Sequence, residues 1–182
     1  MKIIFAEYES VEKAPKIYFK PDSALVRSNK PFYIPEFSDN IVAQACSVLK
    51  ISRLGKNIGT KFAERYFSEI SIGVCFTAQN LSDGLAYSFD YSAVVSDFSV
   101  KENFDLQKTE ISFFKNDILV SKNNFLETQN IENKIITYIS SFCTLKMGDL
   151  IFLVNKNNTK MAIGDTLTAF LNENKLIEIK IK

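Results

Sequence analysis

Short apolar runs alternate with polar turns along most of the chain, a pattern typical of a protein built mainly from β-strands. β-branched and aromatic residues fill these runs, and Lys, Asn, Asp and Gly separate several of them. The pair Asn116-Asp117 marks the turn of a hairpin. We predict strands at 2–5, 17–20, 41–51, 71–80, 87–98, 109–114, 118–121, 150–154, 166–171 and 176–181.

Helical spacing occurs in two segments. After Thr60, a residue able to cap a helix, apolar side chains recur on one face as far as Ile70. In 131–142, isoleucines follow one another at intervals of four. We therefore expect two short helices, at about 61–70 and 131–142, packed on a sheet. With 182 residues and 46% hydrophobic content, the chain can form one core, and we expect a single domain over 1–182.

Charge and targeting signals exclude several classes of partner. The 22 Lys and Arg nearly balance the 21 Asp and Glu, so nothing favours binding to nucleic acid or to an anionic membrane. The apolar run that follows Lys2 is too short for a signal peptide or a membrane span. Three cysteines without a C-x-x-C spacing fit reduced, buried thiols. We expect a cytoplasmic protein.

The absence of histidine from the sequence removes the commonest general base, imidazole ligand and triad member. The run 71–80 is apolar, β-branched and aromatic enough to be a buried strand, and it would place Cys75, Gln79 and Asn80 in a pocket. Alternation along 41–51 places Gln44 and Cys46 on one face of their strand. Amides and thiols are poor acids, bases and charged ligands at pH 7, so such a pocket has few groups that could take part in catalysis.

The order of several short motifs resembles the small members of the fumarylacetoacetate hydrolase family, metal-dependent enzymes that hydrolyse, decarboxylate or isomerise 2-keto and enol acids. The resemblance covers nearly the whole chain and rests on 19–25 (FKPDSAL), 54–58 (LGKNI), 72–81 (IGVCFTAQNL), 88–90 (SFD) and 144–152 (TLKMGDLIF). It implies a mixed β-sandwich roll, a symmetric dimer, and Mg²⁺ or Mn²⁺ as the cofactor of the active relatives.

The same resemblance implies that the metal ligands are missing here. The two carboxylates of the family's Glu-x-Glu strand correspond to Gln44 and Cys46, and the third carboxylate corresponds to Cys75. A hard divalent ion needs oxygen ligands, preferably anionic ones, which one amide and two thiols do not supply. We therefore expect no metal cofactor in this chain.

Other catalytic groups of the family are also replaced. Gln79 and Asn80 stand for the Arg and Asp that follow the third ligand, and Tyr87 stands for the lysine that polarises the substrate, whereas Asp90 is retained. The glycine-rich loop reads 153–156 (LVNK), the Gly-Asn-Thr motif reads 123–125 (NNF), and the lid is shortened to about 6–15. Because metal, base and oxyanion donor act as one unit, their joint loss indicates lost catalysis.

Each unusual residue also has an ordinary interpretation. Cys46 and Cys75 would be neighbours and could begin a soft-metal site or a disulfide, but core packing is the simpler reading. Asp90 fits a local hydrogen bond, and Cys143, at a helix end, fits burial better than reactivity. The polar run 155–160 fits a solvated loop.

We therefore predict a strand-rich α+β fold of the fumarylacetoacetate hydrolase type and a catalytically inactive homologue retained as a binding or structural module. Its partner is an unknown protein or a small acid, and it forms a homodimer. The alternative is a residual divalent-metal-dependent hydrolase, decarboxylase or isomerase of keto or enol acids. The vestigial pocket would consist of Gln44, Cys46, Cys75, Gln79, Asn80, Tyr87 and Asp90.

Overall fold

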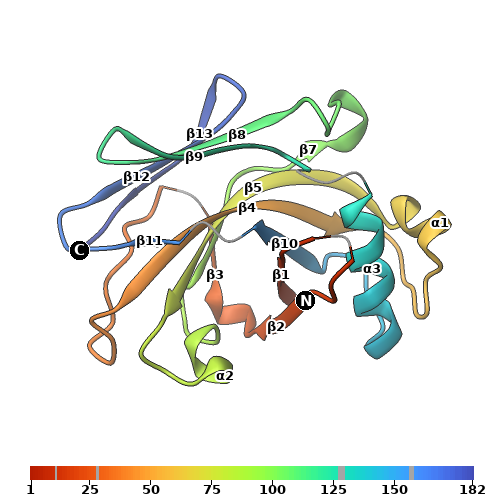
Figure 1. Ribbon diagram of the computed structural model, residues 1–182, viewed down its shortest axis with the longest axis horizontal. Helices are drawn as coiled ribbons and strands as arrows, with labels where there is room; N and C mark the ends of the chain where they lie inside the picture. Colours follow the sequence, from red (N-terminus) through yellow and green to blue (C-terminus); the bar gives the residue numbers. More distant parts are fainter. Residues whose placement is uncertain (11, 28, 127–129, 156–157) are drawn as a thin grey trace.

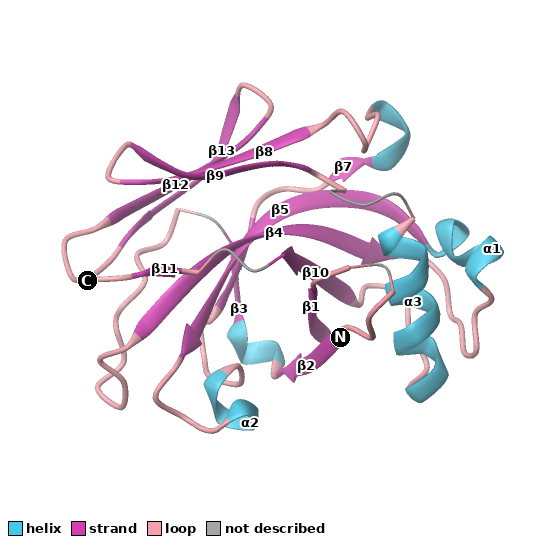
Figure 2. Ribbon diagram, in the orientation of Figure 1, coloured by secondary structure: helices cyan, strands magenta, loops and turns pink. Residues whose placement is uncertain are grey.

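The computed structural model describes residues 1–182 apart from 11, 28, 127–129 and 156–157 (Figure 1). Strands dominate the described part of the chain, and the few helices lie at its margins (Figure 2). The strands are β1 (Ile3–Tyr8), β2 (Lys16–Lys20), β3 (Leu25–Arg27), β4 (Ile41–Ile51), β5 (Phe67–Ala78), β6 (Ala93–Val95), β7 (Ser99–Val100), β8 (Glu110–Lys115), β9 (Ile118–Asn124), β10 (Leu150–Asn155), β11 (Thr159–Lys160), β12 (Thr166–Leu171) and β13 (Asn174–Lys180).

The larger sheet curls around the two longest strands, β4 and β5 (Figure 1). Its order is β2-β1-β10-β4-β5-β6-β3, with β11 beside β4 and β7 beside β5. β4 and β5 pair antiparallel from Ile41↔Ala78 to Ile51↔Phe67, whereas β1 pairs parallel with β10. This mixed pairing is the strand-rich roll that the sequence predicts.

The smaller sheet, in the order β13-β12-β8-β9, packs across the outer face of β4 and β5 (Figure 1). The β8–β9 hairpin turns at Asn116 and Asp117, whose φ values are 50° and 62°. Two positive φ values are what a tight type I′ turn requires, and Asn and Asp tolerate them better than most residues. The prediction of this hairpin is confirmed.

The two predicted helices had different outcomes. α3 spans Ile131–Phe142, as the spacing predicts, and packs its isoleucines into the core. The helix predicted at 61–70 is wrong: α1 covers Thr60–Ala63, a 3₁₀ turn follows at Glu64–Tyr66, and β5 already begins at Phe67. Pairing of the whole length of β4 with a strand outweighs the local helical spacing.

The predicted strand at 87–98 is largely wrong as well. Only Ala93–Val95 of this run forms a strand, β6. The preceding residues form the short helix α2 (Asp83–Ala86) and a turn in which Tyr91 has a φ of 61°. No described helix is long and apolar enough to cross a membrane.

The core lies on both faces of β4. Alternate residues such as Ala43 and Leu49 face outward, where they meet the smaller sheet and α3. The others, including Cys46 and Val48, face the inside of the roll, where they meet Phe5 of β1 and further apolar side chains of β10. The inward face of β4 and β5 is the one that carries the candidate site.

Candidate functional site

Three sequence-predicted residues lie on the inward face of the β4–β5 pair. In the register of this pair, Gln44 is opposite Cys75, and Cys46 is opposite Gly73. Gln44 is 4% exposed, Cys46 1% and Cys75 0%. The structure therefore brings together the three side chains to which the resemblance assigns the metal-ligand positions, in the interior of the roll.

Lys20, at the end of β2, places its ammonium group in the same interior. The residue is 4% exposed. Its Nζ donates hydrogen bonds to the carbonyl oxygen of Tyr87 at 2.6 Å and to Oγ of Ser92 at 3.0 Å, with a longer contact of 3.5 Å to the carbonyl oxygen of Phe76. The ring of Phe5 lies 5.8 Å from Nζ. Dipoles and an aromatic face, which are all neutral, thus surround this buried amino group.

The electrostatics of Lys20 and the two thiols are linked. Burial lowers the pKa of the Lys20 ammonium, while Cys75 and Cys46 act in the opposite direction. Burial raises the pKa of the Cys46 thiol well above its ordinary value, and the hydrogen bond with the Cys75 thiol adds to this rise, although Lys20 opposes it. Cys46 is therefore a neutral thiol at pH 7, and a neutral thiol is a weak metal ligand.

A cavity of about 410 Å³ opens beside Gln44, at the mouth of the roll. Gln44 and Thr77 form its floor on β4 and β5, and Gln79 follows at the end of β5. Other residues complete the wall, namely Glu7, Lys16, Asn40, Val42, Leu81, Asp83, Ala86, Tyr87 and Asn158. The lining is thus mostly polar, with amides as its commonest side chain.

Tyr87 closes one side of the cavity. Its ring stacks on Tyr18, with centroids 3.8 Å apart and an interplanar angle of 13°. Burial raises the pKa of the Tyr87 phenol, and the neighbours Tyr18 and Glu7 raise it further. Tyr87 is consequently a neutral phenol at physiological pH and carries no positive charge at the place that the resemblance assigns to a lysine.

Four of the sequence-predicted residues do not line this cavity: Cys46 and Cys75 lie in the apolar interior of the roll, and Asn80 and Asp90 make hydrogen bonds elsewhere. Asn80 accepts a hydrogen bond from Oγ of Ser38 and donates one to the carbonyl oxygen of Phe37 at 3.3 Å. Asp90 accepts a hydrogen bond at 2.5 Å from Oγ of Ser23, a residue 67 positions away, so the local hydrogen bond expected from the sequence is wrong. Both side chains therefore fasten loops.

The residues present do not fit a divalent metal ion of the Mg²⁺ or Mn²⁺ type. Such an ion takes oxygen ligands, and the three candidate positions offer one amide oxygen and two sulfurs. In the part of the chain that the structure describes, no three His, Cys, Asp or Glu residues are grouped as a metal site would need.

The cysteines themselves have ordinary environments. All three are free thiols, and Cys46 and Cys75 are buried. Cys143 follows the last turn of α3 and is half-buried, which is less than the burial expected from the sequence. Of the run 153–156 that stands for the family's glycine-rich loop, residues 153–155 belong to β10 and residue 156 lies outside the described residues. In the run 155–160, expected to be a solvated loop, Thr159 and Lys160 instead pair with β4 as β11.

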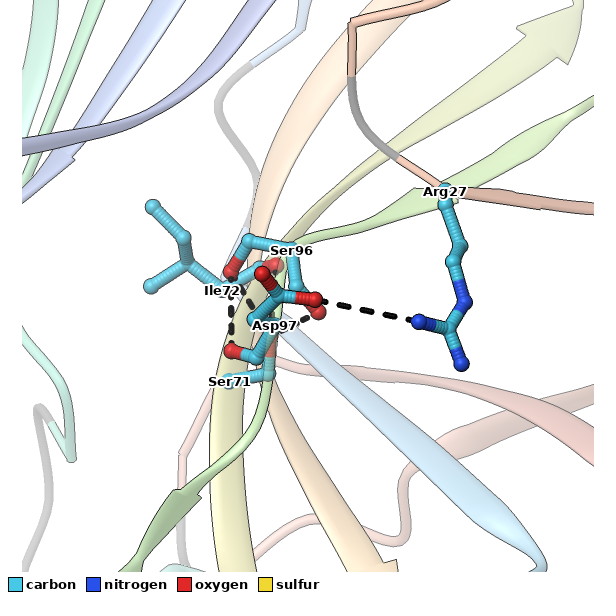
Figure 3. Close-up of polar contacts among 5 residues, drawn as sticks. All are labelled: Arg27, Ser71, Ile72, Ser96 and Asp97. Carbon is cyan, nitrogen blue, oxygen red and sulfur yellow. Dashed lines mark hydrogen bonds and ion pairs between the residues drawn. The ribbon is translucent and has the colours of Figure 1, made fainter.

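A buried serine pair is the other notable polar cluster of the larger sheet (Figure 3). Oγ of Ser71 lies 2.8 Å from Oγ of Ser96 and donates to the carbonyl oxygen of Ser96 at 3.0 Å. Nearby, Arg27 and Asp97 form an ion pair of 3.9 Å between highly exposed side chains, which contributes little. These bonds fasten the end of β6 onto β5 and place no base on either hydroxyl.

Sequence reasoning missed Lys20 and Thr77 as members of the site. Lys20 belongs to the 19–25 motif, in which the proline after it predicts a turn but gives no information on the direction of the lysine side chain. Its pairing with Ile3, a buried strand residue, fixes that direction. Thr77 follows from alternation alone, because it lies two residues beyond Cys75 on the same face of β5.

Comparisons with known proteins agree with this architecture. The family model described as fumarylacetoacetate (FAA) hydrolase C-terminal matches residues 4–182. No curated protein matches this chain. Solved structures do match, and at the identities found they establish the fold.

Three of these structures illustrate the similarity. A putative fumarylacetoacetate hydrolase family protein from Yersinia pestis CO92 is 24% identical, with a TM-score of 0.87 over 100% of this chain and 92% of that one. A putative isomerase from Escherichia coli is 19% identical, with a TM-score of 0.89 over 100% and 91%. Fumarylpyruvate hydrolase from Pseudomonas aeruginosa, in complex with Mn²⁺ and pyruvate, is 16% identical, with a TM-score of 0.88 over 100% and 89%.

The match of the family model to nearly the whole chain, on a fold shared with these structures, shows that the chain belongs to the fumarylacetoacetate hydrolase family.

Proposed function

We propose that this chain is a catalytically inactive member of its family that serves as a binding or structural module. The observation that carries the proposal is the set Gln44, Cys46 and Cys75 on the inward face of β4 and β5, with the Lys20 amino group near the thiols. This set offers no anionic ligand at the positions where the resemblance implies three carboxylates.

The remaining polar groups support the same proposal. A general base near neutrality is a requirement of the family's chemistry, and the sequence contains no histidine. The Tyr87 phenol holds its proton because its pKa is raised, and Asp90 is engaged with Ser23 outside the cavity. The cavity beside Gln44 nevertheless persists, so binding without chemistry is the function that its walls favour.

The alternative is a residual metal-dependent hydrolase, decarboxylase or isomerase of 2-keto or enol acids. Two observations favour it: Glu7 and Asp83 line the cavity, and a relative of the same fold carries Mn²⁺ and pyruvate. In this alternative, the carboxylates of β1 and α2 would take the place of those missing from β4 and β5.

Metal content and turnover test the two functions against each other. The purified protein is analysed for bound metal and then assayed with oxaloacetate and an acylpyruvate, with Mg²⁺ or Mn²⁺ added. A positive control for metal binding, called the carboxylate variant, combines the substitutions Gln44→Glu, Cys46→Glu and Cys75→Asp. We expect Mn²⁺ to raise the melting temperature of the carboxylate variant and not that of the parent, because a ligand of the native state stabilises it. Metal-dependent turnover by the parent would refute the proposal.

A further inference from the structure

In the described part of the chain, β13 is the last strand of the smaller sheet, and its outer edge is covered at one end only. There the backbone N–H of Phe32 donates to the carbonyl oxygen of Lys180 at 2.9 Å, and the N–H of Lys182 donates to Phe32 at 2.8 Å. Backbone groups two residues apart along a strand point to the same side. The N–H and C=O of Glu178 and the N–H of Lys180 therefore point to this edge, and within the described residues no other backbone bonds to them.

A groove of about 540 Å³ lies along the open part of the edge. One wall is β13, from Lys175 to Lys180, and the opposite wall contains Asn29 and Pro31. Asn29 has a φ of 73°, which lies outside the strand region, so the chain turns there and cannot extend its pairing along β13. The edge thus has room beside it for another extended segment.

The groove is basic. Among its described lining residues, Lys175, Lys180 and Lys182 are cations, and Glu178 is the one acid. The Lys175 ammonium lies 2.6 Å from the Glu178 carboxylate. Its hydrogen bond and charge hold the pKa of Glu178 below the ordinary value, and the charge of Lys180 lowers this pKa further. Because Glu178 balances one lysine, an excess of positive side-chain charge remains for a partner.

The side-chain pattern of β13 favours an acidic partner that is not a second copy of this chain. Ile177 and Ile179 are buried under the sheet, whereas Lys180 alternates with them and is exposed. Alternate side chains of a strand added to this edge would lie beside Lys180, where carboxylates are favourable. A second copy paired through the same edge would instead bring its own lysines against those of the first copy, which is unfavourable.

We propose that an extended acidic segment of another protein binds in this groove as an added strand on the open edge of β13. The backbone of Glu178 and the N–H of Lys180 form the main-chain hydrogen bonds, and the lysines of the groove contact acidic side chains of the segment. The groove shares no lining residue with the cavity beside Gln44. The inference therefore goes beyond the proposed function and does not depend on the loss of catalysis.

Fluorescence anisotropy of a labelled peptide tests this interaction. The probe is a hexapeptide of alternating glutamate and valine, blocked at both ends, and the protein is titrated up to roughly 1 mM. We expect saturable binding that weakens in roughly 0.5 M sodium chloride, because salt screens exposed charges. The same peptide with a fully N-methylated backbone cannot donate main-chain hydrogen bonds and should bind about tenfold more weakly. Failure of the first peptide to bind, or equal binding of the N-methylated one, would overturn the proposal.

Two variants of Glu178 separate strand addition from simple attraction of charges. Both remove the acidic side chain of the groove, so attraction alone predicts tighter binding in each. Glu178→Thr keeps the backbone N–H and should bind at least as tightly as the parent. Glu178→Pro removes the N–H that points to the open edge, a position where a strand tolerates proline, and should bind about tenfold more weakly. Equal binding by the two variants would refute strand addition, and the N-methylated peptide decides the question if the proline variant does not fold.

Lys180→Glu tests the charge, with Lys122→Glu as the matched control. Both lysines are exposed, and they lie on the two opposite edge strands of the smaller sheet, β13 and β9. We expect Lys180→Glu to weaken peptide binding about tenfold and Lys122→Glu to bind as the parent does. An equal loss in both variants would show unspecific attraction and refute the site. Turnover of oxaloacetate with Mn²⁺ would refute the proposed function and leave peptide binding unchanged, so the two hypotheses fail separately.

Discussion

Thr77→Val should stabilise the protein, because the Thr77 hydroxyl is buried without a hydrogen-bond partner among the described residues. Thr77 is 5% exposed, and a valine has the same shape with a methyl group in place of the hydroxyl. Burying an unpaired hydroxyl costs about 1–3 kcal/mol of folding free energy, which the valine avoids. Its buried methyl group adds at most about 0.8 kcal/mol of hydrophobic stabilisation. Both residues suit a strand, so strand propensity changes little.

We expect a gain in the free energy of unfolding of about 1 kcal/mol, the low end of this range, which corresponds to a rise in melting temperature of roughly 3 °C for a chain of this length. Urea unfolding followed by far-UV circular dichroism measures the gain, since the sequence has no tryptophan to report by fluorescence. Thr168→Val, at a half-buried position of β12, is the matched control and should change stability by less than about 0.5 kcal/mol.

A Thr77→Val protein that is no more stable than the parent would refute this reasoning. In that case the hydroxyl has a hydrogen-bond partner in the native protein, such as an ordered water in the cavity. A loss of stability with an unchanged control would give the free energy of that bond directly.

Three further outcomes are expected. Asp165→Asn should destabilise the protein by about 1 kcal/mol at pH 7, because burial raises the pKa of Asp165 but the hydrogen bonds from Lys115 and two other groups hold it below its ordinary value. The difference in stability from the parent should therefore shrink below about pH 4, where the carboxylate of the parent becomes protonated. A gap between the urea midpoints that stays constant down to about pH 3 would contradict this. Gly73→Ala should cost about 2 kcal/mol, because the new Cβ would lie 2.6 Å from Phe152 and 2.7 Å from the carbonyl oxygen of Val94, and a variant that melts like the parent would show that these neighbours yield. Light scattering should give twice the chain mass of 20.7 kDa, as expected of a homodimer, and a monomer would rule this out.

The sequence predicts those elements whose local pattern and tertiary environment agree. In α3, the isoleucine spacing matches the face that is buried, and in the β8–β9 hairpin the turn residues suit the backbone that the turn requires. Where the two disagree, the long-range pairing prevails. Phe67 and Ile70 have helical spacing with Phe62, but they pair with β4, and Phe62 remains 43% exposed.

The candidate site is predictable in part for the same reason. Alternation places Gln44 and Cys46 on one face, and the register then brings Cys75 beside them. Alternation cannot reveal where a lysine on a third strand directs its long side chain, so Lys20 was missed. Nor can it separate Asn80 from the cavity, since a hydrogen bond with Ser38, distant in sequence, turns that side chain away.

The parallel pairing of β1 with β10 has a consequence for the order in which the protein assembles. Ile3 is matched with Leu150, so β1 gains this neighbour only after Leu150 has been synthesised. β4 and β5 are close in sequence and can pair early, whereas closing so long a loop is entropically costly. All six residues of β1 are buried in the native protein. β1 can pair early with β2, but its other edge stays open to solvent, chaperones or other chains until β10 arrives, so the docking of β1 on β10 is vulnerable to misassembly during synthesis.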